Sequence, residues 1–270
     1  MNIGNTATRI IVSVVAIPVI IAACMIGKLF LLGFVLAIAL ASFYELGLMA
    51  RNKSVSVNFP LGLSSVALII LNTYFEIMEF RDLCYAIVAL LFIAELFRNK
   101  GSALLNTGVT LAGIFYIGLF ASAIVGIREF YSYDYINGGY LIIGLFITIW
   151  VCDSAAFFIG SAIGKHKLFP RVSPKKSWEG AVAGFIFAVA AMIILKYIML
   201  GFLSTSAAVA TGVIVGTVGQ LGDLTESLLK RDAGVKDSSA LIPGHGGVFD
   251  RFDSLLLTAP VVYLLLTYQL

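Results

Sequence analysis

Residues 227–254 read SLLKRDAGVKDSSALIPGHGGVFDRFDS, and apolar runs flank them on both sides. The stretch holds four basic residues, four aspartates and a histidine. Yet of all 270 residues 60% are hydrophobic and only 12% are charged, with a mean hydropathy of +1.01. A soluble domain carries about 25% charged residues. The composition therefore predicts an all-α, polytopic integral membrane protein that is interrupted by this polar segment.

A membrane-spanning helix needs about 20 mainly apolar residues. By that criterion we expect about nine spans, at residues 9–27, 29–49, 60–78, 83–97, 103–126, 138–159, 180–200, 206–229 and 254–269. With nine spans, most Lys and Arg residues fall on one side of the membrane, and the Lys- and Arg-rich side is cytoplasmic. The sequence thus predicts a multi-pass cell-membrane protein with its N-terminus inside, its C-terminus outside and a polar cavity facing the cytoplasm.

Charge divides the chain into two parts. In residues 1–135 the charges lie mostly near the ends of predicted spans, so we expect these residues to form mainly a scaffold of transmembrane helices. Residues 136–270 contain two basic clusters, several acids within spans and both histidines. We therefore predict that the transmembrane helices of the C-terminal part carry the catalytic site.

Acidic residues in the predicted spans are candidate functional groups. Asp223 and Glu226 lie three residues apart and share a helix face. An ionised Asp within a span is unfavourable by about 2.5–3.5 kcal/mol, so it normally faces a cavity, a partner or a metal ion. Asp250 and Asp253 repeat this spacing where the last span begins, where an acid can also simply complement the helix dipole. Asp153 is a further candidate, either as a ligand or as the partner of a nearby lysine.

The first basic cluster lies in GKHKLFPRVSPKKSWEG, residues 164–180. Such a loop is often only a topology signal and an anchor for anionic headgroups. Here Ser173 and the proline after it favour a turn, and Lys175 and Lys176 follow at once. A helix should then start near Ser177, where backbone N–H groups can bind anions. The pattern indicates a phosphate site at headgroup depth.

The opening stretch combines cations with a glycine-rich turn. Its cations nearest to the acidic span are Lys230, Arg231 and Lys236. The glycines around His245, among them Gly246 and Gly247, would let the backbone approach a ligand closely. Mg²⁺ takes oxygen ligands, usually one or two carboxylates plus substrate phosphates. These residues alone point to metal-assisted phosphoryl or nucleotidyl transfer onto a lipid.

Residues 227–253 resemble the signature of the phosphatidate cytidylyltransferases, or CDP-diacylglycerol synthases. GQLGDLTES, SPKKSWEG and DSAAFFIG resemble further motifs of that family. The resemblance implies the Mg²⁺-dependent reaction CTP + phosphatidic acid → CDP-diacylglycerol + pyrophosphate. It implies that Asp223 and Asp250 are metal carboxylates, and to these we add Asp153 as a further candidate metal ligand. The residues that it places around the phosphates and the substrate are Lys230, Arg231, Lys236, His245, Gly246, Gly247, Arg251, Ser173, Lys175 and Lys176.

Other functions share some of these features. A CTP-dependent lipid kinase of the polyprenol or phytol type would use similar polar groups and release CDP. A transporter for an anionic solute would also place acids and basic pockets in the membrane, but no inverted repeat is visible. A CDP-alcohol phosphotransferase would need a D-G-x-x-A-R core, which this sequence lacks. We expect CTP, phosphatidic acid and membrane lipid as partners and no nucleic acid, whereas homo-oligomerisation, acyl-chain preference and a second metal ion stay open.

Overall fold

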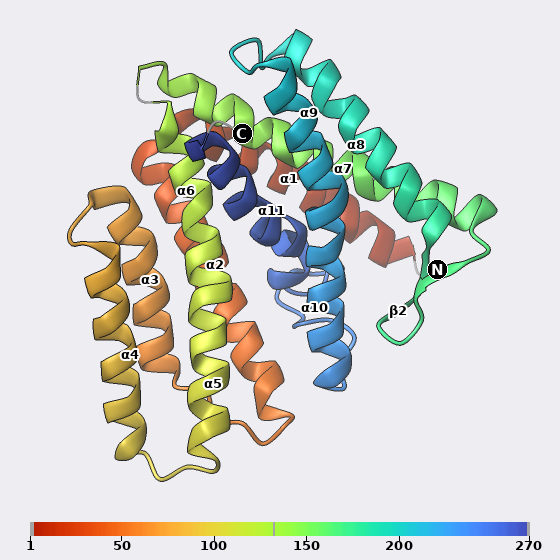
Figure 1. Ribbon diagram of the computed structural model, residues 1–270. Coiled ribbons are helices and arrows are strands. Elements are labelled where there is room, and N and C mark those ends of the chain that lie inside the picture. The colour runs from red at the N-terminus through yellow and green to blue at the C-terminus, as the bar shows by residue number, and fades with distance from the viewer. Residues whose placement is uncertain (1–2, 132, 269–270) are drawn as a thin grey trace. The chain divides into compact units, whose positions relative to one another are not determined.

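The computed structural model describes residues 3–131 and 133–268, and these are mostly helical (Figure 1). The elements in chain order are α1 (Ile3–Ile26), α2 (Lys28–Arg51), α3 (Phe59–Phe75), α4 (Phe80–Leu96), α5 (Ala103–Gly113), the π-helical turn η1 (Ile114–Leu119), α6 (Phe120–Phe130), α7 (Tyr135–Ile163), β1 (Lys167–Phe169), β2 (Ser173–Ser177), α8 (Trp178–Ile198), α9 (Thr205–Ile214), the π-helical turn η2 (Val215–Gly219), α10 (Gln220–Asp232) and α11 (Phe249–Tyr268).

Each of the nine apolar runs predicted to span the membrane contains a helix. The last run begins earlier than predicted, at Phe249, and its final residue, 269, lies outside the described residues. Within the described residues five helices are long and apolar enough to cross a membrane, namely α2, residues 103–130, α7, α8 and residues 205–232. Residues 10–26 and α3 form shorter apolar helices. These helices fit a polytopic membrane protein, while the number of nine spans stays a prediction.

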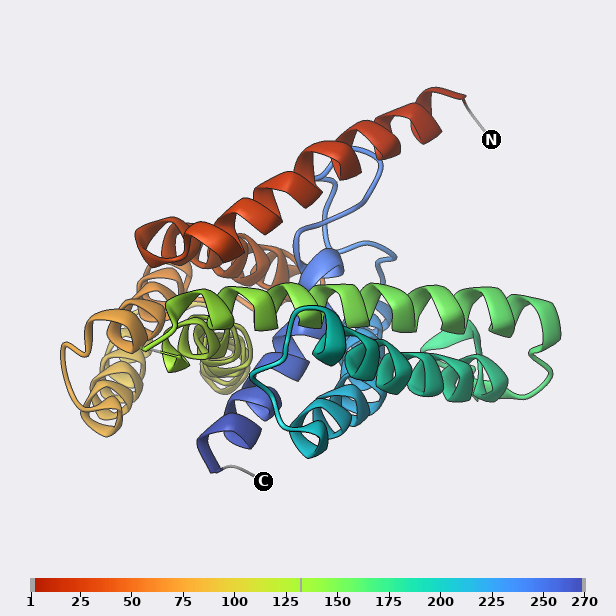
Figure 2. The same cartoon turned by 90° about the horizontal axis from the view of Figure 1, so that it is seen from above.

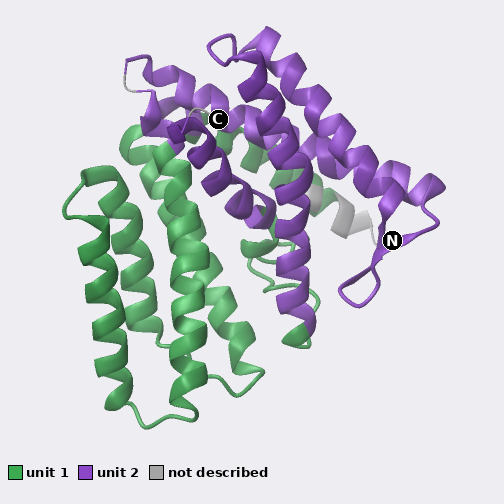
Figure 3. Cartoon of the chain, viewed as in Figure 1, with its two compact units in different colours: residues 1–23, 27–126, 232–251 green, residues 24–26, 127–231, 252–270 purple. Residues whose placement is uncertain are grey.

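The chain forms two compact units (Figure 3). Unit 1 comprises Met1–Ala23, Gly27–Gly126 and Asp232–Arg251, and unit 2 comprises Cys24–Ile26, Ile127–Arg231 and Phe252–Leu270. This division differs from the sequence-based one at residues 1–135 and 136–270, because the polar segment 232–251 clusters with the N-terminal helices. The location of the catalytic site stays a prediction. The N-terminal helices pack with residues 232–251, which are most of the signature stretch.

In unit 1 the helices α2, α3, α4 and α5 lie side by side (Figure 1). Close packing depends on glycines that face aromatic rings. A Cβ atom on Gly62 would lie 2.1 Å from the ring of Phe43, and one on Gly113 would lie 2.9 Å from the same ring. Because Phe43 is buried, these glycines let its ring fill the space between α2, α3 and α5.

In unit 2 the long helix α7 runs alongside α8 (Figure 2). A Cβ atom on Gly180 would lie 2.6 Å from the carbonyl oxygen of Ala156, so only glycine lets these two helices approach so closely. The same holds between α10 and α11, where a Cβ atom on Gly222 would lie 2.7 Å from the carbonyl oxygen of Asp253. Small residues commonly permit such contacts in membrane helices. Gly222 thus brings the first turns of two acid-bearing helices together.

The strands β1 and β2 form an antiparallel hairpin that the all-α prediction missed. Lys167 is paired with Ser177, and Phe169 with Ser173. The turn lies at residues 170–172, so the prediction of a turn at Ser173 was wrong, since Ser173 begins β2. The hairpin is largely exposed and rich in charge. It therefore lacks the alternation of apolar and polar residues that normally indicates a strand.

Candidate functional site

In unit 2, Asp223 and Lys176 form a direct ion pair. Asp223 lies in the first turn of α10, and its Oδ2 lies 2.6 Å from the Nζ of Lys176 on β2. The hydroxyl of Ser227, one turn further along α10, donates to Oδ1 of Asp223 at 3.3 Å. The two side chains of the ion pair are 28% and 32% exposed, so a ligand can reach them. Two motifs that lie 47 residues apart in the sequence thus meet at this pair.

Two further acids lie in the electrostatic neighbourhood of this pair. Asp253, near the start of α11, interacts with the charges of Asp223, Asp153 and Lys176. Three acids near one ammonium leave at least two of them without a matching positive charge, and a bound cation would favour their ionised forms. Within residues 3–131 and 133–268, no group of three or more His, Cys, Asp or Glu side chains is close enough to hold a metal ion by itself. Mg²⁺ commonly takes only one or two carboxylates besides substrate phosphates, so Asp223 and its neighbours fit that ion.

The hairpin that carries Lys176 is held at the end of β2 and at its turn. Ser177 caps α8, because its hydroxyl accepts a hydrogen bond from the Gly180 N–H at 3.2 Å. This confirms the predicted helix start. Near the hairpin turn, Arg231 Nε donates to the Val172 carbonyl at 3.3 Å. Arg231 therefore has a positioning contact with the hairpin, whatever it also does for a phosphate.

The remaining residues predicted on β2 and α10 differ in their surroundings. Ser173 is half-buried and Lys175 is exposed. Lys230, predicted as a phosphate ligand, forms an ion pair with Glu226 one turn earlier on α10, with Nζ 2.6 Å from Oε2. This pair is largely buried, with side chains 12% and 1% exposed. The sequence analysis placed Glu226 on one helix face with Asp223, and in the structure Glu226 forms its ion pair with Lys230.

In unit 1, the carboxylate of Asp250 is held by the loop that precedes it. Its Oδ2 accepts the backbone N–H of Ser238 at 3.0 Å and that of Gly247 at 2.7 Å, and lies 3.1 Å from the Ser238 hydroxyl. Gly246 has φ +86°, and a Cβ atom there would lie 2.7 Å from the same Oδ2. Glycine is thus required at 246 by both its backbone conformation and its closeness to Asp250.

Glu45 on α2 holds the same loop, and the sequence analysis did not single it out. Its Oε1 accepts hydrogen bonds from the Ser239 hydroxyl at 2.6 Å and the Val248 N–H at 2.9 Å. Its Oε2 accepts from the Ser238 hydroxyl and the Phe249 N–H, both at 2.8 Å. The available signal was an acid inside the apolar run 29–49, since intramembrane acids are functional candidates by default.

The other predicted residues of the loop differ in burial. Lys236 and Arg251 are exposed. His245 is half-buried. Its backbone N–H donates to the Ile242 carbonyl at 2.9 Å, and its ring Nε2 lies 3.5 Å from the Ser13 hydroxyl. Its Nδ1 is buried without a hydrogen-bond partner in the part of the chain that the structure describes. A water molecule or a ligand oxygen would satisfy that nitrogen.

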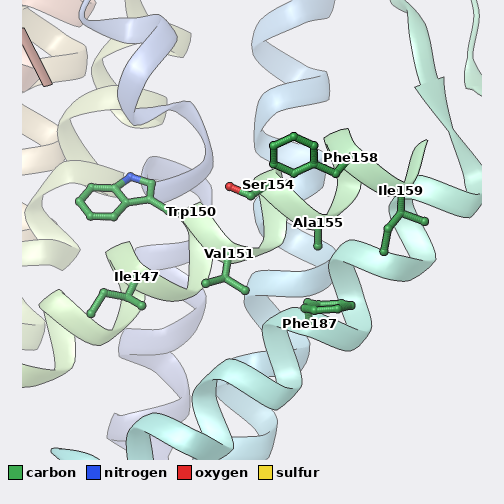
Figure 4. A pocket seen from close by; sticks show the side chains of 8 residues that line it. All are labelled: Ile147, Trp150, Val151, Ser154, Ala155, Phe158, Ile159 and Phe187. Carbon is green, nitrogen blue, oxygen red and sulfur yellow. The ribbon is translucent and has the colours of Figure 1, made fainter. Parts of the chain in front are cut away.

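An open apolar groove of about 480 Å³ lies along α7 in unit 2 (Figure 4). Its lining comes from α7 and from one α8 side chain: Ile147, Trp150, Val151, Ser154, Ala155, Phe158, Ile159 and Phe187. Asp153 lies next to Ser154 on the same helix. The groove thus follows a helix that also carries a candidate acid, and its apolar lining suits a hydrocarbon chain.

Comparison with known proteins identifies the family. A model of the cytidylyltransferase family matches residues 7–269. The chain belongs to the cytidylyltransferase family. The match spans both units and all the residues predicted to act on the substrate, and a cytidylyltransferase is a nucleotidyltransferase enzyme.

Relatives of this cytidylyltransferase chain carry a more specific name. Phosphatidate cytidylyltransferases of Staphylococcus haemolyticus and Bacillus subtilis are 32% and 33% identical over 97% and 96% of the chain, and over 98% and 96% of their own lengths. The phosphatidate cytidylyltransferase of Haemophilus influenzae is 45% identical over 52% of the chain. That last match spans about half the length of the Haemophilus protein (51%).

Proposed function

We propose that the protein is a phosphatidate cytidylyltransferase of phospholipid biosynthesis, which converts CTP and phosphatidic acid into CDP-diacylglycerol and pyrophosphate. The observation that carries this proposal is the ion pair between Lys176 and Asp223. It joins an exposed basic hairpin to an acid-bearing helix in a chain whose relatives bear that enzyme's name. Cations beside carboxylates are what a reaction between an anionic lipid and a polyanionic nucleotide requires.

The chemistry needs no strong general base. A phosphomonoester has a second pKa near 6, so the phosphatidate oxygen that attacks the α-phosphorus of CTP is already largely ionised at about pH 7. The barrier comes from repulsion between two anions and from charge that develops on pyrophosphate as it leaves. Lysine and arginine side chains would reduce both, because each neutralises phosphate charge in the transition state.

We assign the roles as follows. Ser173, Lys175 and Lys176 would bind substrate phosphate at the hairpin. Asp223 and Asp250 are proposed as the Mg²⁺ carboxylates, with Asp153 as an additional ligand, and bound Mg²⁺ would neutralise phosphate charge. The proposed phosphate ligands in the rest of the chain are Lys230, Arg231, Lys236, His245, Gly246, Gly247 and Arg251.

Lys230 now forms a largely buried ion pair with Glu226, so a phosphate would have to reach the same ammonium group beside Glu226 or replace it there. Arg231 uses Nε for the hairpin contact, and a guanidinium has further N–H donors for a phosphate.

The proposed site faces the cytoplasm, where CTP is available, with the N-terminus inside and the C-terminus outside. The excess of Lys and Arg in the loops predicted on that side supports this orientation. Phosphatidic acid would enter from the bilayer, and the apolar groove along α7 is suited to one of its acyl chains.

CTP labelled in two positions tests the proposal. The purified protein is incubated with phosphatidic acid, Mg²⁺ and CTP carrying ³²P at either the α- or the γ-phosphate. We expect the α-label in the lipid and the γ-label in pyrophosphate, with no transfer by the Asp223→Asn variant. In a parallel incubation with a polyprenol as acceptor, a lipid kinase would instead put the γ-label into lipid and leave the α-label in CDP. Flux of an anionic solute without any labelled lipid would indicate a transporter and contradict the proposal.

A further inference from the structure

Glu45 is a buried acid whose partners all come from one distant segment. Its exposed fraction is 1%, and its four hydrogen-bond donors lie in residues 238–249, between 193 and 204 positions away in the sequence. None of the ion pairs in the described part of the chain includes Glu45. The carboxylate is therefore matched by four directional hydrogen bonds.

The pattern of these hydrogen bonds holds residues 238–249 in a defined position relative to Glu45. Each carboxylate oxygen takes one hydroxyl and one backbone N–H. The N–H groups of Val248 and Phe249 stand at the start of α11, where the first N–H groups of a helix lack partners within it. A negative charge there also complements the helix dipole. Glu45 thus caps α11 from another helix, α2.

The same contacts reach Asp250, the next residue of α11. The Ser238 hydroxyl lies 2.8 Å from Oε2 of Glu45 and 3.1 Å from Oδ2 of Asp250. Gly247, whose N–H donates to Asp250, approaches Glu45 so closely that a Cβ atom would lie 2.5 Å from Oε2. The two residues that orient Asp250 are therefore themselves held against Glu45.

We propose that Glu45 is a positioning residue: its carboxylate clamps residues 238–249 to α2 and thereby sets the orientation of the Asp250 carboxylate for its metal ion. The inference rests on the proposed function only in the role that it assigns to Asp250. Outer-shell groups of this kind typically change metal affinity or activity about 10–100-fold when they are lost.

Glu45→Gln tests the clamp while keeping the size of the side chain. An amide has one acceptor oxygen and one NH₂ group, so in either orientation one N–H of the α11 start faces a donor. We expect the amides of Val248 and Phe249 to exchange hydrogen about tenfold faster or more. We also expect the Mn²⁺ concentration at half-saturation, measured by electron paramagnetic resonance without substrate, to rise about tenfold or more. The Mg²⁺ concentration for half-maximal transfer should rise in parallel.

Two other variants keep the test decisive. Ser239→Ala removes one donor to Glu45 without touching Asp250, and should raise the Mn²⁺ half-saturation about two- to tenfold. It takes the place of Glu45→Gln if that variant does not fold. Asp232→Asn removes an exposed contact at the end of α10, before this segment begins, and should leave Mn²⁺ binding unchanged.

Each contrary result overturns the proposal. One is a Glu45→Gln protein that loses thermal stability but keeps its metal half-saturation and its rate per folded molecule, which would show a structural role alone. Another is an equal effect of Asp232→Asn, or no effect of Ser239→Ala. Absence of Mn²⁺ binding by the unaltered chain also overturns it. Absence of labelled lipid alone refutes the proposed function instead, because exchange and Mn²⁺ binding are measured without turnover.

Discussion

Glu45 in unit 1 and Glu226 in unit 2 are both buried glutamates on helices, and their charges are satisfied in different ways. Glu45 on α2 and Glu226 on α10 are exposed by only 1% and 0%. Glu45 accepts two hydroxyls and two backbone N–H groups from a segment far along the chain. Glu226 pairs with Lys230, one turn away on its own helix. The two acids are almost equally buried, and the hydrogen-bond partners of Glu45 lie 193–204 positions away along the chain.

Glu45 and Glu226 therefore affect the fold differently: Glu45 positions a distant loop, and Glu226 pairs within its own helix. Hydrogen bonds to backbone N–H groups depend on angle as well as distance, so Glu45 fixes the path of residues 238–249. An ion pair one turn apart joins two side chains of the same helix and stabilises that helix locally. Unit 1 thus holds the signature loop by hydrogen bonds to its backbone and hydroxyls, whereas unit 2 pairs Lys176 and Lys230 with acids.

Glu226→Ala should give the largest effect on stability. It leaves the Lys230 ammonium buried without its counter-charge, and breaking a buried pair in this way costs about 3–5 kcal/mol. The double variant Glu226→Leu/Lys230→Met should recover most of the loss, because it removes both charges and keeps the volume. Thermal and chemical unfolding in detergent measure both variants. Equal destabilisation by the single and the double variant would show that volume, rather than charge, matters at this position.

Lys176→Met should reduce turnover much more than it reduces stability. The side chain is partly exposed, so its loss affects mainly the phosphate charge that it would neutralise. Removing one such group typically lowers kcat about 10²–10³-fold. Lys167→Met on the paired strand is the matched control, since Lys167 is exposed and has no proposed role. Rates of CDP-diacylglycerol formation that fall equally in both variants would contradict a specific role for Lys176.

Local patterns in the sequence predicted the helices well. An apolar run long enough to cross a bilayer must satisfy its own backbone, so each predicted run contains a helix. The pairing of Lys176 with an acid was also within reach, because both belong to motifs with unusual charge in an apolar chain. The Glu226–Lys230 pair follows from spacing alone, although the sequence analysis assigned those residues other partners.

Contacts between distant residues could not be predicted in this way. No local pattern indicates that Glu45 meets Ser238, because nearly two hundred residues separate them. For the same reason the sequence put residues 232–251 with the C-terminal helices, while they pack in unit 1. The hairpin was missed for a different reason: its strands face solvent, so burial imposes no alternation on them.

Gly246→Ala tests how tightly the loop of unit 1 is packed. The new Cβ atom would meet both an unfavourable positive φ and the Oδ2 of Asp250 at 2.7 Å. We expect a loss of about 2–3 kcal/mol in the free energy of unfolding. Gly234→Ala is the matched control, because its φ is +72° but nothing lies within 4 Å of its Cβ position. It should cost only about 1 kcal/mol, and an equal cost for both variants would show that Asp250 moves aside freely.

Asp232→Asn should have the smallest effect, although it touches the same loop. Asp232 pairs with Lys53 at 3.1 Å, but the side chains are 67% and 47% exposed, and such pairs contribute about 0.2–1 kcal/mol. Asp232 also ends α10, where a negative charge opposes the helix dipole, so the two contributions partly cancel. We therefore expect a change below about 0.5 kcal/mol in unfolding experiments, and one that shrinks further at high salt. A larger, salt-independent loss would mean that the exposed Asp232–Lys53 pair holds the chain as firmly as the buried Glu45 contacts do, and the contrast between these two attachments would disappear.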